Sequence, residues 1–478
     1  MKKLFFFTIG VFLILISYSQ SITGNWEGTL NANGTELPVV FHIAKDSTGK
    51  LVGLMDSPKQ MAYGLKCTSI FVNGDSVILE MKSFGGKFKG IVSSDNKTLT
   101  GNWFQGGASL PLDLKKTNDV ATIKEIKRPQ TPKPPFVYFS DEVSYSNADK
   151  SVTFGGTFTY PMNKVLKKYP TVILITGSGQ QDRDETILQH KPFAVIADYL
   201  TKKGMALLRV DDRGIGKTTG NFRTSTTADF AQDVETSLAY LKTRKEVDTN
   251  KIGLIGHSEG GMIAPMVAGR RKEIKFIVLL AGPGVAIKEL MVQQNIDVLT
   301  AAGISKNEAG LYGSLFKNLL ATVLPEKDTA IAMKNATAVF TNWQKSITEN
   351  VVKNTTGVTD EKSKTQFITA FVNQVNQPWF NYFIKFNPAD YLSKIHCAVL
   401  ALNGQKDIQV AAVPNLTAID KILTAGKVQN FTTQSIPGLN HLFQHCKSCT
   451  VQEYAELEET FAPEVLQLMS DWIKGIVK

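Results

Sequence analysis

At 478 residues the chain is too long for one ordinary domain, and two domains are expected. Its formal net charge is +10 at pH 7. The basic residues are spread along the sequence rather than gathered in a patch with interleaved aromatic residues, which argues against a nucleic-acid partner. Four cysteines in a chain of this length exclude a scaffold built on disulfides.

Residues 1–20 are typical of a secretory signal peptide. Lys2 and Lys3 precede a nearly continuous apolar run over residues 4–16, and the small residues Ser17 and Ser19 follow it. We expect cleavage near Ser19 and export to the periplasm or the medium. Stable membrane insertion after cleavage is not expected, because the apolar run is short for a membrane span. Loss of the two lysines leaves a net charge of +8 (10 − 2).

Residues 21–115 predict a small all-β domain, either a barrel or a sandwich. Short stretches with alternating hydrophobicity are separated by turn pairs such as Asn73-Gly74. The tripeptide Gly-Asn-Trp occurs near the start and again near the end, which suggests that the first and last strands lie close together. The aromatic residues Trp26, Trp103 and Phe104 are interpreted as core residues, with a binding surface as the alternative.

Residues 116–136 are rich in lysine and proline and predict a stiff basic linker. Residues 137–478 then alternate between strand and helix patterns, which predicts an α/β domain with a mostly parallel sheet. Strands are expected at 171–176, 205–211, 251–256, 276–281, 397–403 and 430–435, with an edge strand at 152–160. Helices are expected at 192–203, 229–242 and 453–476. Residues 284–385 interrupt this alternation with several helices, and we expect them to cap the active site.

The stretch Gly256-His257-Ser258-Glu259-Gly260 follows an apolar run and precedes a helix-compatible segment. This is the strand–turn–helix context of a nucleophile elbow, in which glycines leave room for a strained turn that exposes the serine hydroxyl. The pattern predicts a serine hydrolase with Ser258 as the nucleophile. The backbone N–H of Glu259 should then face the oxyanion, with a second donor from the loop after residue 176. Ser178 is the preferred second donor and Gly179 the alternative.

His441 is the expected general base, because it follows the last strand in a loop that begins with a glycine turn. Asp407 is the expected acid, because it directly follows a buried strand at the edge of the sheet where active sites gather. Asp390 and Asp420 are the alternatives, but the first precedes that strand and the second has the pattern of an exposed helix residue. The charged stretches 182–184 and 211–213 are expected to brace their loops.

Two further features lie near these residues. The aromatic residues Trp379, Phe380 and Phe383 are expected either to line an acyl pocket or to pack the cap against the core. Cys446 and Cys449 form a Cys-x-x-Cys pair without further residues at zinc-ligand spacing, which favours a local disulfide or free thiols. If oxidised, the pair would stiffen the loop of His441, and a reducing agent should then lower activity. No metal or organic cofactor is expected.

Residues 137–478 resemble the α/β-hydrolase superfamily, and especially exported bacterial esterases described as serine aminopeptidase-like, which join a small N-terminal β domain to a capped hydrolase. The matching stretches are residues 177–184, 209–216, 256–261, 378–383, 402–410 and 439–444. The resemblance implies a triad of Ser258, Asp407 and His441. These relatives usually carry histidine where this chain has Thr176, which bears on the oxyanion loop rather than on the triad.

The expected reaction is hydrolysis of a small-molecule carboxylic ester with a short to medium acyl group, through an acyl-enzyme. An aminopeptidase or prolyl-type peptidase would use the same triad, and Glu259 or a cap glutamate would then bind the substrate ammonium. A non-catalytic surface or glycan-binding protein is the alternative from another class, although such proteins usually lack a member of the triad. The sequence is also compatible with a homodimer.

Overall fold

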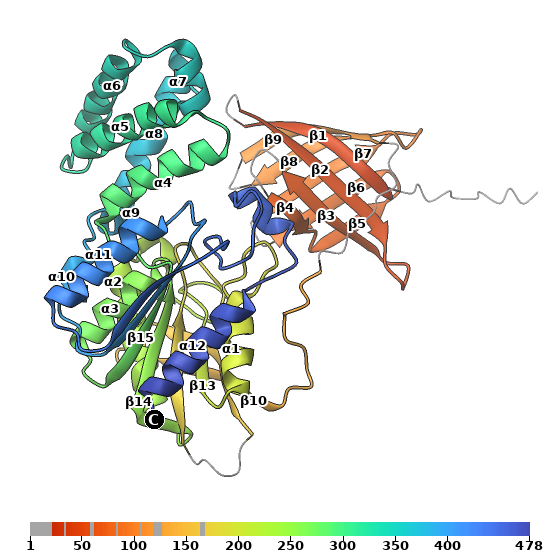
Figure 1. Cartoon of the computed structure of the whole chain (residues 1–478). Coiled ribbons are helices and arrows are strands. Elements are labelled where there is room, and N and C mark those ends of the chain that lie inside the picture. Colours follow the sequence, from red (N-terminus) through yellow and green to blue (C-terminus); the bar gives the residue numbers. More distant parts are fainter. Residues whose placement is uncertain are drawn as a thin grey trace, which may run out of the picture. The chain divides into compact units, whose positions relative to one another are not determined.

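The computed structural model describes residues 22–32, 35–57, 62–82, 85–105, 108–117, 127–162 and 168–478. The chain divides into two compact units, Met1–Glu125 and Ile126–Lys478 (Figure 1). The predicted signal peptide lies outside the described residues, as do residues 118–126 of the predicted linker. No helix in the described ranges combines the length and the apolar character that crossing a membrane would require.

The described part of the N-terminal unit is one antiparallel sheet of nine strands, in the order β4-β3-β2-β1-β9-β8-β7-β6-β5. The strands are β1 (Gly24–Ala32), β2 (Thr35–Lys45), β3 (Leu51–Ser57), β4 (Ala62–Lys66), β5 (Ser69–Asn73), β6 (Ser76–Met81), β7 (Gly86–Val92), β8 (Thr98–Gln105) and β9 (Ala108–Lys116). The predicted all-β class is confirmed, and the strands form one curved sheet rather than the two sheets of a sandwich (Figure 1). The predicted closeness of the first and last strands is also confirmed, because Glu27 of β1 pairs with Lys115 of β9.

Aromatic side chains fill the core of this unit. Trp26 and Trp103 are 0% and 3% exposed, and Phe41 lies within 6.4 Å of the Trp103 ring. The indole N–H of Trp26 donates to the Ile22 carbonyl at 2.7 Å, which satisfies its polar group inside the core. Phe104 is 36% exposed. A binding surface built on all three aromatic residues is therefore wrong, since the two tryptophans are core residues.

The C-terminal unit is built on a sheet of eight strands within its described residues, in the order β10-β11-β13-β12-β14-β15-β16-β17. The strands are β10 (Tyr138–Ser146), β11 (Thr153–Pro161), β12 (Tyr169–Ile175), β13 (Ala206–Val210), β14 (Val247–His257), β15 (Ile274–Leu280), β16 (Ala398–Gly404) and β17 (Phe431–Ile436). All pairs from β13 to β17 are parallel, as predicted. The chain order reverses at β12, which lies between β13 and β14, so the loops after β12 and β14 meet at a topological switch point where ligands commonly bind.

Strand β11 lies inside the sheet, so the prediction of an edge strand over residues 152–160 is wrong. It pairs with β13 on one side and with β10 on the other. Strand β10 was not predicted, because its sequence YFSDEVSYS is mostly polar and only Tyr138 and Val143 are buried. A strand of this composition suits the solvated edge of a sheet.

The described end of the predicted linker is attached to the C-terminal unit. The Arg128 guanidinium donates to the backbone oxygens of Leu188, Ala455 and Leu457 at 3.0, 2.9 and 2.7 Å. The Gln130 amide donates to the Phe461 carbonyl at 2.7 Å. Burial lowers the pKa of Arg128 to about 10. Residues 127–136 therefore do not behave as a free linker, because side chains in this segment satisfy buried carbonyl groups.

Helices cover both faces of the C-terminal sheet (Figure 1). They are α1 (Pro192–Lys202), α2 (Thr227–Leu241), α3 (Gly260–Arg270), α11 (Ala412–Ala425) and α12 (Pro463–Ile476). Side chains of α1 and α12 share one hydrophobic cluster, and those of α2, α3 and α11 share another. The helix predicted over residues 453–476 begins only at Pro463, because proline is favoured in the first turn and the preceding short 3-10 helix η4 (Val451–Ala455) is separate. A second 3-10 helix, η3 (Phe222–Thr224), precedes α2.

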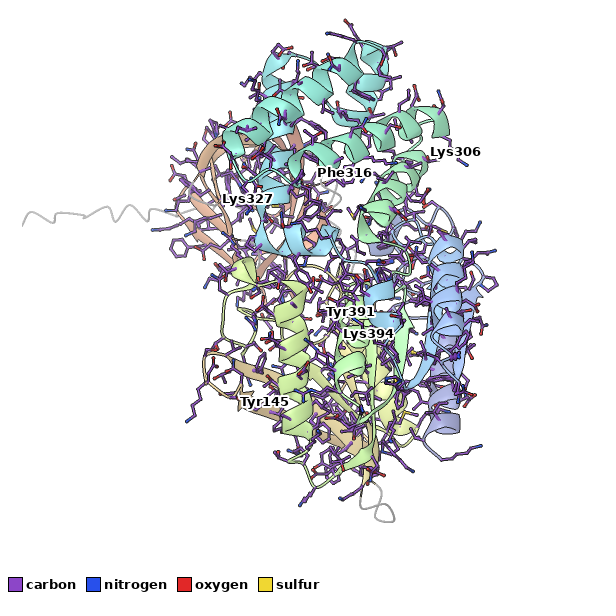
Figure 2. All side chains as sticks on the ribbon, turned by 90° about the vertical axis from the view of Figure 1, so that its left-hand side faces the viewer. Tyr145, Lys306, Phe316, Lys327, Tyr391 and Lys394 are labelled. Carbon is purple, nitrogen blue, oxygen red and sulfur yellow. A yellow bond between two sulfur atoms is a disulfide. The ribbon has the colours of Figure 1, made fainter. Side chains whose placement is uncertain are left out.

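Between β15 and β16 the chain forms a helical insertion, as the sequence predicts. It contains α4 (Ile287–Ala301), α5 (Lys306–Val323), α6 (Thr329–Gln344), α7 (Glu349–Thr356), α8 (Glu361–Asn376), α9 (Pro378–Ile384) and α10 (Ala389–Leu392). Ser305 and Glu308 form a capping box at the start of α5, which satisfies its first backbone donors. The insertion has its own apolar contacts, and Phe316 lies among its helices (Figure 2). Phe316 packs edge-to-face on Phe371, with the ring centroids 5.7 Å apart.

Candidate active site

Ser258 occupies a tight turn between the end of β14 and the start of α3. Its φ is +53°, a left-handed conformation that is strained for serine. A Cβ on Gly256 would lie 2.1 Å from the Gly260 carbonyl oxygen, and a Cβ on Gly260 would lie 2.2 Å from the Ile175 oxygen. Only glycine fits at these two positions. Ser258 is half-buried, whereas its neighbours His257 and Glu259 are buried.

His441 and Asp407 are brought together from the loops after β17 and β16. His441 Nδ1 lies 2.8 Å from Asp407 Oδ2, and both side chains are buried. The other Asp407 oxygen accepts from the backbone N–H groups of Gln409 and Val410 at 2.8 and 2.9 Å. A carboxylate held in this way fixes the histidine tautomer with hydrogen on Nδ1 and leaves Nε2 as the basic nitrogen.

The loop of His441 is held by an asparagine. Asn440 Oδ1 accepts from the backbone N–H groups of Leu442 and Gln444, both at 3.0 Å. The Asn440 N–H in turn donates to the Gln444 carbonyl at 3.0 Å. Beyond this tight loop, Cys446 and Cys449 form a disulfide, which is one of the two states that the sequence left open.

His441 also lies beside the elbow. Its carbonyl oxygen is 3.1 Å from His257 Nε2, and the rings of His257 and His441 are 4.8 Å apart between centroids. Since His257 directly precedes Ser258, the base and the nucleophile come from adjoining segments. Within the described part of the chain, no hydrogen bond joins Ser258 to His441. Hydrogen bonds between catalytic groups often tighten only once substrate is bound.

The loop after β12 lies against the elbow. A Cβ on Gly177 would stand 3.3 Å from Ser258 Cβ, so the backbone of this loop passes close to the serine. Among the described residues, none accepts a hydrogen bond from the backbone N–H of Ser178, Gly179 or Glu259. These three N–H groups are the ones that the sequence assigned to an oxyanion hole.

Ion pairs stabilise the loop after β12, as expected from its charged residues. Arg183 pairs with Asp211 at 2.7 Å and with Glu142 at 2.9 Å. Asp184 pairs with Lys191 at 3.1 Å and also with Arg209.

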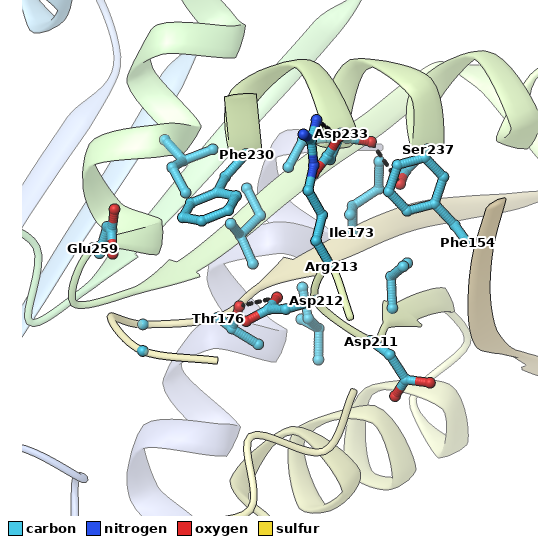
Figure 3. A pocket seen from close by; sticks show the side chains of 17 residues that line it. Phe154, Ile173, Thr176, Asp211, Asp212, Arg213, Phe230, Asp233, Ser237 and Glu259 are labelled. Carbon is cyan, nitrogen blue, oxygen red and sulfur yellow. Dashed lines mark hydrogen bonds and ion pairs between the residues drawn. The ribbon is translucent and has the colours of Figure 1, made fainter. Parts of the chain in front are cut away.

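Asp212 lies under the same loop, where it accepts from the Thr176 hydroxyl at 2.9 Å and from the Gln181 N–H at 2.8 Å. Burial raises the pKa of Asp212 to about 8. Asp212 lines a cavity of about 50 Å³. The lining of this cavity runs from the loop after β12 to Glu259 (Figure 3). The ion pair between Arg213 and Asp233 lines another part of the same cavity.

Glu259 faces the helical insertion rather than open solvent. Its carboxylate accepts from the Thr227 hydroxyl at 2.6 Å and from Trp379 Nε1 at 2.9 and 3.1 Å. Burial raises the pKa of Glu259 to about 7. Phe380 and Phe383 are only 2% and 9% exposed, which fits core packing better than an open pocket lining.

One residue of this site, Glu185, was not recognised in the sequence. Glu185 lies 3.0 Å from His257 Nδ1, and the two residues are separated by 72 positions. Nothing in the local sequence around Glu185 marks it, since buried glutamates are rare and are explained only by a spatial partner. Within the described residues, no group of three His, Cys, Asp or Glu side chains is arranged to hold a metal ion.

The sheet, the strained serine turn and the loops at the switch point define an α/β-hydrolase domain. Residues 190–372 match a family model described as "Serine aminopeptidase, S33". Esterase EstD of Thermotoga maritima is 31% identical over 170 residues, which are 35% of this chain and 40% of that esterase. The matched region thus spans less than half of the curated relative.

Solved structures that match part of this chain include an esterase and Est1E. An esterase of Pyrococcus furiosus has 17% identity over 74% of this chain and 99% of that chain, with a TM-score of 0.39. Est1E of Butyrivibrio proteoclasticus, solved with ferulic acid, has 15% identity over 70% of this chain and 96% of that chain, with a TM-score of 0.37. The C-terminal unit thus combines the α/β-hydrolase fold with partial sequence similarity to a serine aminopeptidase family model and to an esterase.

Proposed function

We propose that this chain is a serine hydrolase that cleaves carboxylic esters with a short to medium acyl group. The observation that carries the proposal is the buried His441–Asp407 pair at 2.8 Å, on a loop whose backbone contacts the residue before Ser258. The strained turn at Ser258 and the similarity to EstD support it. No step of this chemistry requires a metal or an organic cofactor.

The proposed reaction has two halves. His441 Nε2 takes the proton of the Ser258 hydroxyl as its oxygen attacks the ester carbonyl, and the imidazolium then returns that proton to the leaving alcohol. Water, deprotonated by the same nitrogen, attacks the acyl-enzyme and releases the carboxylic acid. Asp407 stabilises the imidazolium in both halves, because its carboxylate accepts the hydrogen bond from Nδ1.

The negative charge on the carbonyl oxygen needs fixed donors. In this proposal the backbone N–H of Glu259 supplies one and that of Ser178 the other, with Gly179 as the alternative. The support is that these groups carry no acceptor within the described residues and flank the Ser258 turn. Removal of one such donor typically costs about 100- to 1,000-fold in kcat.

The direct test is the Ser258→Ala variant with a short nitrophenyl ester as substrate. The variant should fold as the wild type does, by circular dichroism, and lose turnover to the background rate. Retained turnover in purified Ser258→Ala protein would contradict the proposal. Asp420→Asn serves as a matched control, since it alters an exposed carboxylate whose one hydrogen-bond partner among the described residues is Thr433.

Cleavage of N-terminal amide bonds is the second candidate, favoured by the description of the matching family model. A peptidase of that kind needs a carboxylate for the substrate ammonium. Glu259 is a poor choice, because its oxygens already accept from Thr227 and Trp379 and its pKa is raised to about 7. Rates on aminoacyl anilides and on acyl esters, measured with one preparation, separate the two candidates.

Export is part of the proposal. The basic start, the apolar run over residues 4–16 and the small residues after it support cleavage near Ser19 and a periplasmic or secreted enzyme. The helical insertion is proposed to act as a cap, because Trp379 of α9 contacts the residue after the nucleophile. A small-molecule ester is the proposed substrate, and a homodimer is left to solution measurement.

A further inference from the structure

Glu185 and His257 form a second buried carboxylate–histidine pair beside Asp407 and His441. Glu185 Oε1 lies 3.0 Å from His257 Nδ1, and the two side chains are 1% and 7% exposed. Among the described residues, no lysine or arginine pairs with Glu185, and His257 is the basic group that faces it. The proposed mechanism gives neither residue a role.

Both nitrogens of the His257 ring face acceptors. The His441 carbonyl, 3.1 Å from Nε2, can only accept, so Nε2 carries a hydrogen. Glu185 Oε1 already accepts from the Gly177 N–H, and as an acceptor toward Nδ1 it favours a hydrogen on that nitrogen too. Burial alone would lower the pKa of His257, yet Glu185, the His441 carbonyl and Asp407 together outweigh burial and raise it. Both ring nitrogens therefore face oxygen acceptors, an arrangement that favours the imidazolium form.

This ion pair joins three parts of the active site. Glu185 Oε1 accepts from the Gly177 N–H at 2.6 Å, which fixes the start of the oxyanion loop. His257 is the residue directly before Ser258, and its Nε2 donates to the backbone carbonyl of His441. A single carboxylate–imidazolium pair is thus bonded to the segments that carry the oxyanion donors, the nucleophile and the base.

The residues packed around the Glu185–His257 pair are mostly apolar and shield it from solvent. Apolar side chains enclose it, from α1 (Pro192, Phe193, Ile196), β15 (Leu280) and the C-terminal loops (Leu442, Phe461). Asp407 is the other charged group that acts on His257, and its negative charge also favours the imidazolium. The turn that presents Glu185 is braced by Asp182, whose Oδ1 accepts from the N–H groups of Asp184 and Thr186, both at 3.0 Å.

We propose that the Glu185–His257 ion pair positions the oxyanion loop, Ser258 and His441 relative to one another, and that its charge is required for full turnover. Neither residue touches the reacting atoms, so both are positioning residues. The proposal rests on the proposed serine hydrolase function. Because misplacement of catalytic groups by about 1 Å costs on the order of 100-fold in rate, loss of the pair should lower kcat by a similar factor.

The first test uses Glu185→Gln, which keeps the shape and an oxygen for the Gly177 N–H but removes the charge. We expect kcat for a nitrophenyl ester to fall by about 100-fold with KM changed by less than about threefold. Glu361→Gln, at an exposed glutamate paired with Lys364, is the matched control and should keep wild-type kcat. A folded Glu185→Gln variant within about twofold of wild-type kcat would overturn the proposal.

A double variant tests whether the two residues act as a unit. Glu185→Gln combined with His257→Gln should lower kcat by less than the product of the two single losses, because each single change already removes the ion pair. Fully multiplicative losses would contradict a shared role. Since Ser258→Ala tests the reaction itself, an active wild type with an inactive Ser258→Ala variant shows that failure here concerns the pair and not the proposed function.

A measurement on the unaltered protein covers the case in which the variants do not fold. Nitrogen NMR of protein labelled with ¹⁵N-histidine reports each ring of the six histidines separately. At pH 7 the His257 ring should show two protonated nitrogens. A His257 ring with one unprotonated nitrogen at pH 7 would overturn the proposal without any assay of activity.

Discussion

Trp379 Nε1 donates to both carboxylate oxygens of Glu259, at 2.9 and 3.1 Å. One residue belongs to helix α9 of the insertion, and the other directly follows Ser258. The backbone of Glu259 and its side chain therefore serve different purposes: the N–H faces the proposed oxyanion, and the carboxylate anchors the insertion to the elbow. This contact is the structural reason to treat the insertion as part of the active site.

Replacement of this donor should weaken both the fold and the reaction. Trp379→Phe keeps an aromatic ring to stack on Phe383, at 5.0 Å, but leaves the buried Glu259 without one donor. We expect a loss of about 1–3 kcal/mol in unfolding free energy, measured by denaturant titration, and a lower kcat/KM. Trp343→Phe removes a similar N–H, bonded to the Leu311 carbonyl, elsewhere in the insertion. It should destabilise without changing kcat/KM, and equal effects of the two variants on kcat/KM would contradict this role.

The pKa of Glu259 gives the stability a dependence on pH. Burial raises this pKa from 4.5 to about 7, so the folded state binds the proton more tightly than the unfolded chain does. Stability is therefore full below pH 4.5 and falls as the pH rises to about 7, by about 3 kcal/mol at most. Glu259→Gln should remove this loss, so its unfolding free energy should gain on the wild type between pH 4.5 and 7. Parallel curves for the two proteins would contradict the assignment.

Asp407 should affect kcat because its carboxylate fixes the tautomer of His441. Asp407→Asn keeps the shape of the side chain but offers an N–H where His441 needs an acceptor for its Nδ1 hydrogen. We expect kcat to fall by about 10,000-fold, measured with a nitrophenyl ester at neutral pH. Asp390→Asn, at the alternative acid considered from the sequence, should retain activity. An active Asp407→Asn variant would contradict this role and would show that another residue is the acid of the triad.

The loop of His441 should depend more on Asn440 than on the disulfide. Asn440 is fully buried and its side chain accepts from two backbone N–H groups within the loop. Asn440→Ala should lower kcat by at least tenfold, since it frees the segment that carries the base. Reduction of Cys446–Cys449 should lower activity less, because the bridge lies beyond this network. A larger loss of activity on reduction of the disulfide than in Asn440→Ala would contradict this prediction.

The fold could be predicted where local sequence carries its own signal. The apolar runs of β12 and β14 are buried on both faces of the sheet, and such runs are visible in any window. Strand β10 was missed because a half-exposed edge strand has almost no apolar pattern. Residues 127–136 look like a linker by composition, and only the distant carbonyls bonded to Arg128 show that they are docked.

Some residues of the candidate site also carry a local sequence signal, and others do not. Ser258, Asp407 and His441 each follow a recognisable strand, so their arrival at one edge of the sheet follows from the parallel order. Glu185 cannot be predicted in this way, because its place in the site depends on a contact with the ring of His257, 72 positions away. Likewise Trp379 was placed among aromatic residues, but its bond to Glu259 depends on how α9 packs.

Labelling with a fluorophosphonate probe tests the central claim most directly, because the probe reacts covalently with an activated serine and its product can be located by mass spectrometry. The account predicts one modified peptide, which contains Ser258, and no labelling of Ser258→Ala or of heat-unfolded protein. A protein that hydrolyses esters but carries the label on another residue, or takes up no label at all, would contradict it.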